Sequence, residues 1–133
     1  MPDSNPFDSE RLQESGLIKS VEFRQTIPST NDWAKQLIEQ QANRTEGIDL
    51  RANCPKLLLT AVQTAGRGQR QRSWWSGEGS ATFSLVEIMP DPILAPTTGL
   101  ATALSLVETI KELAPQLEPR IKWPNDLYLN SRK

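Results

Sequence analysis

The stretch Lys56-Leu-Leu-Leu-Thr-Ala-Val-Gln63 runs directly into Thr64-Ala-Gly-Arg-Gly-Gln-Arg-Gln-Arg-Ser-Trp74. The first segment is a continuous apolar run bounded by turn-forming residues, which is typical of a strand buried on both faces. The second, extended to Ser80, combines glycines, arginines and two tryptophans, which favours a long loop that faces a ligand. We therefore predict a buried strand that leads into a binding loop over residues 64–80.

The rest of the chain contains a strand and helix pattern on both sides of this segment. Alternating apolar residues predict a half-buried strand that Pro28 ends. Apolar residues at helical spacing predict two helices, and the segment between the first helix and Lys56 is expected to be a surface connection. The expected ranges are strands over 21–27, 81–89, 120–123 and 127–129, helices over 31–42 and 100–114, and a connection over 43–55.

These elements predict an α+β fold, a mixed β-sheet with helices mainly on one face. Residues 1–17 are polar with two prolines and are expected to form a flexible N-terminal arm, whereas residues 18–133 form one domain. The chain stops shortly after the strand over 127–129, with no returning partner strand. We therefore expect a domain that is incomplete at its C-terminus.

The composition excludes several classes of protein. The chain has no histidine and one cysteine, Cys54, so it can form neither a histidine-containing catalytic triad nor a thiolate-rich zinc site. Its 15 Lys plus Arg and 16 Asp plus Glu leave a net charge of -1, which does not favour DNA binding. We find no secretory signal and no apolar run near the roughly 20 residues of a membrane span. A cytoplasmic protein without a membrane partner is expected.

The glycine-arginine loop has the composition of an anion site. Gly66 and Gly68 would let backbone N–H groups approach a phosphate or carboxylate, and the charges of Arg67, Arg70 and Arg72 would neutralise it. The spacing fits neither the P-loop nor the dinucleotide fingerprint, and a basic surface loop is the alternative interpretation. Of the two tryptophans that follow, we expect Trp74 to cover a base or ring, while Trp75 either packs inward or anchors the loop.

A second constellation, Lys122-Trp-Pro-Asn-Asp126, places a lysine at a strand end before a turn. The Lys122 ammonium could stabilise charge that develops as a carboxylate and a phosphoryl group join. Asp126 could hold Mg²⁺ or orient its neighbours. The alternatives are a solvated lysine and an aspartate that only caps the turn.

Together these motifs resemble the N-terminal portion of the catalytic domain of biotin-protein ligases. That family carries Gln-Thr-Ala-Gly-Arg-Gly, then Arg-x-Trp-x-Ser, and later Lys-Trp-Pro-Asn-Asp-Leu-Tyr. Here the matching segments are Gln63–Gly68, Arg72–Ser76 and Lys122–Tyr128. Ser29-Thr-Asn31, between a strand and a helix, matches a third family motif.

The resemblance implies ATP-dependent activation of biotin to biotinoyl-5'-AMP and transfer of the biotinoyl group to a lysine of a biotin carboxyl carrier domain. It implies catalytic roles for Lys122, Arg67 and Arg72, and a Mg²⁺ ligand in Asp126. Biotin would be bound by Ser29, Thr30, Asn31, Gln63, Gly66, Arg67 and Lys122. The adenylate would be bound by Gly68, Arg70, Arg72, Trp74 and Asn125.

The chain also departs from the family pattern. Many members have arginine where this chain has Gln69, and that arginine helps to retain the activated intermediate. Members continue with further strands and usually a small β-barrel domain, which are absent from this sequence. Two other functions stay open, a lipoate-type ligase and a non-catalytic biotin- or adenylate-binding remnant. An exposed sheet edge would also allow a homodimer.

Overall fold

A computed structural model describes residues 6–43, 49–68, 72–77 and 79–130 of the chain. It separates them into two compact units, which span Met1–Ile88 and Met89–Lys133. Each unit has its own sheet and helix, and we describe them one after the other.

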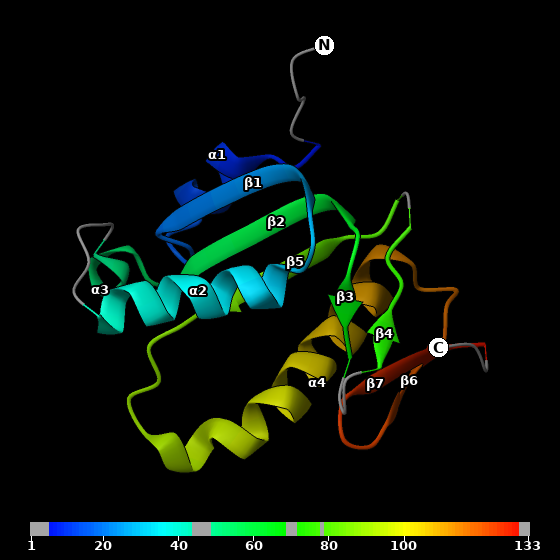
Figure 1. Cartoon of the computed structure of the whole chain (residues 1–133). Coiled ribbons are helices and arrows are strands. Elements are labelled where there is room, and N and C mark those ends of the chain that lie inside the picture. The colour runs from blue at the N-terminus through cyan, green and yellow to red at the C-terminus, as the bar shows by residue number, and fades with distance from the viewer. Residues whose placement is uncertain (1–5, 44–48, 69–71, 78, 131–133) are drawn as a thin grey trace. The chain divides into compact units, whose positions relative to one another are not determined.

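The first unit is built on a three-stranded mixed sheet (Figure 1). Strands β1 (Ser20–Ile27) and β2 (Lys56–Gln63) are parallel, and β5 (Thr82–Val86) pairs with β2 in the antiparallel direction. The predicted α+β class with a mixed sheet is confirmed. The buried half of β2 is Lys56–Thr60, and β5 is shorter than the predicted range of 81–89.

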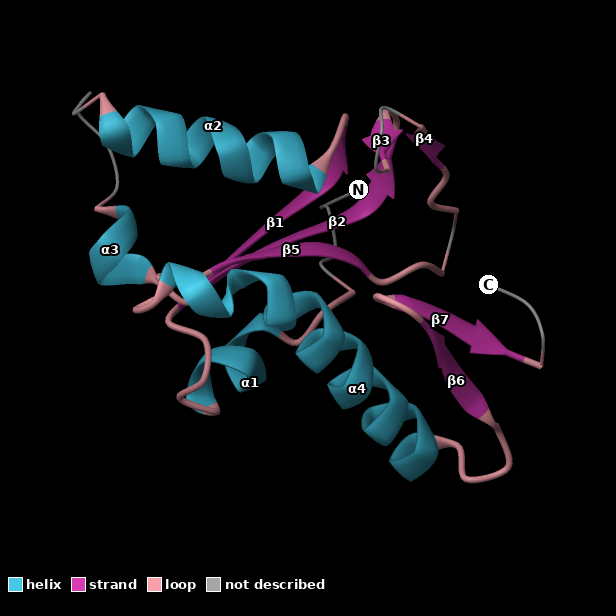
Figure 2. Ribbon diagram, turned by 90° about the horizontal axis from the view of Figure 1, so that it is seen from below, coloured by secondary structure: helices cyan, strands magenta, loops and turns pink. Residues whose placement is uncertain are grey.

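Helix α2 (Thr30–Ala42) covers one face of this sheet (Figure 2). It begins where predicted, directly after Pro28, because the Ser29 side chain caps it by accepting a hydrogen bond from the Asp32 N–H at 3.3 Å. Trp33 and Ala34 point into the core, and the Arg24 guanidinium lies 4.2 Å from the centre of the Trp33 ring. The core cluster consists of Ile27, Trp33, Ala34, Leu50, Cys54, Leu58 and Val86.

Two short helices lie in segments for which none was predicted. Helix α1 (Ser9–Glu14) falls within the expected N-terminal arm, and the neighbouring Phe7 ring lies 6.1 Å from the ring of Phe23 in β1. Helix α3 (Leu50–Asn53) falls in the expected surface connection, and Asp49 caps it. The prediction that this connection lies entirely on the surface was wrong, because Leu50 and Cys54 are buried in the core.

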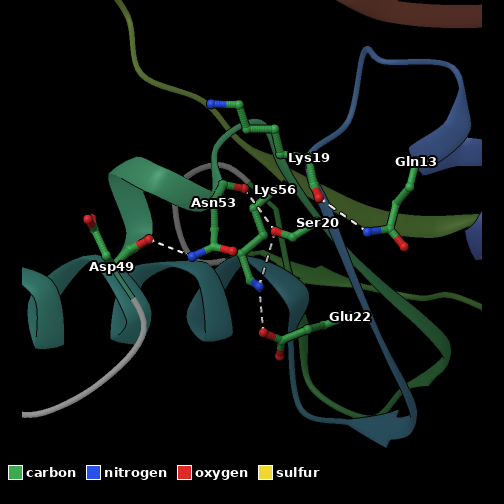
Figure 3. A network of polar contacts seen from close by, with 7 residues as sticks. All are labelled: Gln13, Lys19, Ser20, Glu22, Asp49, Asn53 and Lys56. Atoms are coloured by element: carbon green, nitrogen blue, oxygen red, sulfur yellow. Dashed lines mark hydrogen bonds and ion pairs between the residues drawn. The ribbon is translucent and has the colours of Figure 1, made fainter.

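A polar network fixes the start of β1 against the start of β2 (Figure 3). The Lys56 ammonium is 3% exposed and forms an ion pair with Glu22 at 2.6 Å. It also donates to the Ser20 hydroxyl at 3.4 Å, and that hydroxyl donates to the Asn53 carbonyl at 2.8 Å. Ser20 lies opposite Lys56 in the parallel register, so the network and the strand pairing support each other.

The predicted loop over 64–80 contains a small hairpin of β3 (Gly66–Arg67) and β4 (Ser73–Trp74). Residues 69–71, between these strands, and residue 78 lie outside the described part of the chain.

The second unit packs one long helix against a hairpin. A 3₁₀ turn, η2 (Pro92–Leu94), leads into α4 (Ala95–Leu113), and β6 (Pro119–Lys122) pairs antiparallel with β7 (Asp126–Leu129). Ala103 and Val107 are the buried side chains of α4. The helix starts earlier than the predicted residue 100, because proline is tolerated in a first helical turn and Pro96 lies there.

The segment Pro92–Leu113 is long and apolar enough, by length and composition, to cross a membrane. Its 22 residues contain a window with a mean hydropathy of 1.4, of which 11% is buried. The expectation that no segment would meet this criterion is therefore wrong. Core helices of soluble proteins can pass the same test, so one such helix does not establish a membrane protein.

Candidate functional site

A cavity of about 270 Å³ opens in the first unit, where α2 begins and β2 ends. It brings together six residues that were predicted from two of the motifs, and adds four at and just before the start of β5. The predicted residues are Ser29, Thr30, Asn31, Gln63, Arg67 and Trp74, and the added ones are Ala81, Thr82, Phe83 and Ser84.

A chain of hydrogen bonds lines the inner wall of this cavity. The Ser84 hydroxyl donates to the Thr30 hydroxyl at 2.9 Å, and the Thr30 hydroxyl lies 3.3 Å from Gln63 Oε1. Gln63 Oε1 also accepts from the Thr30 backbone N–H at 2.8 Å, and so satisfies a free donor at the N-terminus of α2. Thr30 is 4% exposed and Ser29 is 2% exposed. Buried polar groups of fixed direction can recognise a polar ligand with both donors and acceptors.

Gly66 is required by close packing at the cavity mouth. A Cβ atom at this position would collide with Nε2 of Gln63 and would lie 2.6 Å from the Trp74 carbonyl oxygen. Just before it, the Thr64 and Ala65 N–H groups donate to the carbonyls of Ile27 and Pro28, at 2.9 and 2.8 Å. The chain is thereby held against the cavity as it leaves β2.

Gly68 differs from the prediction that its backbone N–H is presented to an anion. In this structure the Gly68 N–H donates to the Arg72 carbonyl at 2.7 Å and closes the β3–β4 turn. A Cβ at Gly68 would find its nearest neighbour at 3.6 Å, which is ordinary contact. Gly68 is therefore a turn residue here.

The arginines of the loop occupy different positions. Arg67 lines the cavity, and its Nε lies 3.4 Å from Oδ2 of Asp32. Arg72 is exposed beside β4. The predicted contributions of Arg70 and the departure at Gln69 fall outside the described residues.

The two tryptophans are more exposed than expected. Trp74 lines the cavity and is 51% exposed, which leaves ring surface available to a ligand. Trp75 is 85% exposed, so the prediction that it packs inward or anchors the loop to the core is wrong. Its ring lies against Gly77 instead, where any Cβ would collide with it.

The second unit carries the Lys122 motif on its hairpin. A cavity of about 520 Å³ is lined by Glu118, Arg120, Ile121, Lys122, Tyr128 and Asn130. The Lys122 Nζ lies 5.7 Å from the centre of the Tyr128 ring, on the neighbouring strand, and the ammonium is exposed. Asn125 is exposed in the turn between β6 and β7, and Asp126 is the first residue of β7.

Residues 24–133 match the biotin/lipoate A/B protein ligase family. The chain belongs to this family. The match extends over both units and includes the three motifs on which the resemblance depended, so the predicted family is confirmed.

Known ligases are similar to this family member over most of its length. The Bacillus subtilis protein named bifunctional ligase/repressor BirA is 38% identical over 113 residues, which are 84% of this chain and 31% of that protein. A Helicobacter pylori biotin acetyl coenzyme A carboxylase synthetase, solved with bound biotinylated ATP, is 30% identical with a TM-score of 0.56, covering 84% of this chain and 49% of that chain.

A biotin protein ligase from Aquifex aeolicus, solved with biotin and ATP, is 25% identical with a TM-score of 0.57 and covers 83% of this chain and 41% of that chain. The chain therefore spans about a third of the Bacillus relative.

Sequence reasoning missed two parts of the site in this ligase-family chain. The residues of β5 that line the cavity were assigned only to a strand, although Ser84 is a polar residue within an otherwise apolar run and could have been noticed. Asp32 was not among the predicted site residues, although it pairs with Arg67. Its contact with Arg67 joins residues far apart in the sequence, and no local pattern indicates it.

The resemblance implies a Mg²⁺ ion, but the described residues do not by themselves form a complete Mg²⁺ site. Within the described ranges, no group of three or more His, Cys, Asp or Glu side chains could hold a metal ion. Asp126 offers a single carboxylate, which is enough only for a Mg²⁺ ion whose other ligands include substrate phosphates. We therefore derive no step through the metal.

Proposed function

We propose that the chain carries the biotin-activating part of a biotin-protein ligase, with biotin bound in the cavity at the start of α2. The observation that carries this proposal is the Ser84–Thr30–Gln63 hydrogen-bond chain at the cavity wall, in which Thr30 is buried and the other two are half-buried. A ureido ring has two N–H donors and one carbonyl acceptor. Hydroxyl and carboxamide groups fixed at one end of a cavity match that pattern.

The same observation favours biotin over lipoate. The dithiolane ring of lipoate has no N–H or C=O group, so the Thr30 and Gln63 polar atoms would keep their contacts with each other and gain no hydrogen bond from the ligand. A hydrogen bond that biotin makes and lipoate cannot is worth about 0.5 to 1.5 kcal/mol. Lipoate is therefore expected to bind this cavity more weakly than biotin.

The proposed reaction joins two substrates without a side-chain nucleophile. A carboxylate oxygen of biotin attacks the α-phosphorus of ATP, the bond to the β-phosphate bridging oxygen breaks, and pyrophosphate leaves. The acceptor lysine amine of a carrier domain then attacks the acyl carbon, AMP departs, and the amine loses a proton. Because both nucleophiles come from substrates, the absence of histidine from the chain does not prevent this chemistry.

The residues of the chain act by position and charge in this proposal. Arg67 and Arg72 attract the phosphate of the adenylate, and Trp74 offers its ring to the adenine. Gly68, Arg70 and Asn125 are proposed adenylate contacts from the motif alone. Lys122 is proposed to stabilise the carboxylate and phosphoryl groups as they join, and Asp126 to contact Mg²⁺ that arrives with ATP.

The proposed setting is the cytoplasm, and the proposed partner is a biotin carboxyl carrier domain. The free, buried thiol of Cys54 suits a reducing compartment. We propose no DNA contact for residues 1–133, because a net charge of -1 gives no general attraction to nucleic acid.

Calorimetric titration tests the proposed site. We expect biotin to bind the chain, lipoic acid to bind more weakly, and Thr30→Val to weaken biotin by about tenfold because the valine lacks the hydroxyl that accepts from Ser84 and contacts Gln63. Ser105→Ala, an exposed change on α4, is the control and should bind biotin as the unchanged chain does.

A second assay measures the release of pyrophosphate from ATP in the presence of biotin. A ligase releases pyrophosphate, whereas a chain that only binds biotin or the adenylate does not. Absence of biotin binding by the unchanged chain would refute the proposal.

A further inference from the structure

The ion pair between Asp32 and Arg67 is the feature of the cavity that no motif explains. Arg67 lies in β3 and lines the cavity, whereas Asp32 lies in the first turn of α2, one residue beyond the lining residue Asn31. Their closest atoms, Arg67 Nε and Asp32 Oδ2, are 3.4 Å apart. The contact therefore joins the glycine-arginine loop to the helix that forms the opposite side of the cavity.

The pair takes up one edge of the guanidinium and leaves the rest available. A guanidinium has five N–H donors in a planar fork, and the carboxylate approaches it from the Nε side. The Arg67 side chain stays 62% exposed and that of Asp32 38% exposed. An anion in the cavity can therefore reach Arg67, but it meets a cation whose charge a nearby carboxylate already balances.

Asp32 is held close to the cavity by its backbone. Its N–H donates to the Ser29 hydroxyl, and its carboxylate lies in the first turn, where the helix dipole favours negative charge. The same dipole would favour an anionic ligand at the mouth of the cavity. Asp32 thus occupies, with a charge of its own, the environment that a phosphate would prefer.

We propose that Asp32 is a positioning residue that competes with the ligand phosphate for Arg67. In the unliganded chain it holds the guanidinium at the cavity mouth, and an incoming phosphate has to share or displace it. Asp32 therefore lowers the affinity for phosphate-bearing ligands and leaves the affinity for neutral ones unchanged. The inference rests on the proposed function, because it takes the adenylate phosphate to be the anion at Arg67.

Asp32→Asn separates charge from shape, since an asparagine oxygen can still accept a hydrogen bond from Arg67. The test compares two probes by calorimetry. One is biotinol, the neutral alcohol of biotin, and the other is its stable phosphodiester with AMP. For D32N we expect about twofold to fivefold tighter binding of the phosphodiester, in keeping with a partly exposed charge pair. Biotinol binding should not change, and the difference should shrink as salt is raised.

Two further variants show whether the change in phosphodiester affinity caused by D32N depends on Arg67. Glu39→Gln removes the same charge from an exposed position later in α2 and should change neither affinity. In an Arg67→Gln background, D32N should no longer tighten phosphodiester binding to the same extent, which a double-mutant cycle measures. Thermal melting shows whether each variant folds.

The outcomes distinguish the two proposals. If the unchanged chain binds both probes and D32N leaves their affinity ratio the same or lowers it, the role of Asp32 is wrong and the proposed function stands. If the unchanged chain binds neither probe, the proposed function fails and the inference fails with it.

Discussion

Gly66 shows how a single residue can control the cavity. In Gly66→Ala the added methyl would collide with the Gln63 carboxamide and the Trp74 carbonyl, so the Gln63 contact with Thr30 would have to shift. We expect biotin affinity to fall by about tenfold, in line with the 1 to 3 kcal/mol that overpacking usually costs. Gly68→Ala is the matched control, since its methyl would fit at ordinary contact distance. Equal biotin affinities for the two variants would contradict this account.

Cys54 is a residue whose chemistry is set by its surroundings. Burial, and secondly the charge of Glu87, raises the pKa of the Cys54 thiol above its ordinary value of 9.0. The neutral thiol is therefore favoured in the fold, and its contribution to stability is complete below that value and is lost as pH rises through it. We expect slow alkylation of the folded chain at neutral pH and a fall in unfolding free energy above pH 9.0. Cys54→Ala should remove that part of the pH dependence, and rapid alkylation of the folded chain would contradict the prediction.

At the scale of the element, the pairing of β1 with β2 depends on a buried charge. Glu22→Gln would remove the negative charge beside the Lys56 ammonium, whose side chain is 3% exposed, and leave it with neutral acceptors, the new amide oxygen and the Ser20 hydroxyl at 3.4 Å. We expect a loss of about 1 to 3 kcal/mol in urea unfolding, less than for a fully buried pair because the Glu22 side chain is 31% exposed. Lys56→Met should cost less, since the remaining carboxylate can turn toward water.

The double variant Glu22→Gln, Lys56→Met is the decisive comparison for this network. If Glu22→Gln lowers the unfolding free energy because the buried Lys56 ammonium loses its opposite charge, the double variant should be no less stable than Lys56→Met alone. An additive loss would instead show that Glu22 stabilises β1 by other contacts.

The elements differed in how far the sequence could predict them. Strands β1 and β2 and helix α2 follow from local periodicity and a cap, so their ranges were predicted almost to the residue. The β3–β4 hairpin was missed because two-residue strands have no periodicity. The early start of α4 was missed because its range was predicted from the apolar residues that recur from Leu100, whereas Pro96 occupies the first turn.

At the scale of the whole molecule, the motifs predicted the family, but they did not predict the contacts between residues that are far apart in the sequence. The cavity of the first unit gathers Ser29, Thr30, Gln63 and Arg67, which come from two separate motifs. The roles of Ser84 and Asp32 depend on the register of β5 with β2 and on the approach of β3 to α2, which no local pattern encodes. Sequence reasoning therefore predicted the family more fully than the residues that line the cavity.

The apolar surface of α4 leads to a prediction about assembly. Leu100 is 43% exposed and Leu104 is 52% exposed, one helical turn apart. Contiguous exposed apolar surface favours association. We expect the chain to self-associate with rising concentration in sedimentation velocity experiments.

A charge-matched pair of variants tests whether α4 forms that contact. Leu100→Lys with Leu104→Lys adds two positive charges and should keep the chain monomeric. Glu112→Lys, an exposed change on the same helix, shifts the net charge equally and should still associate.

Flotation with phosphatidylcholine vesicles tests whether the apolar surface of α4 binds a membrane instead of a second copy of the chain. We expect the chain not to float, because Glu108, Lys111 and Glu112 lie in the last turns of the helix. Flotation of the unchanged chain, lost in the double variant, would assign this surface to a membrane instead.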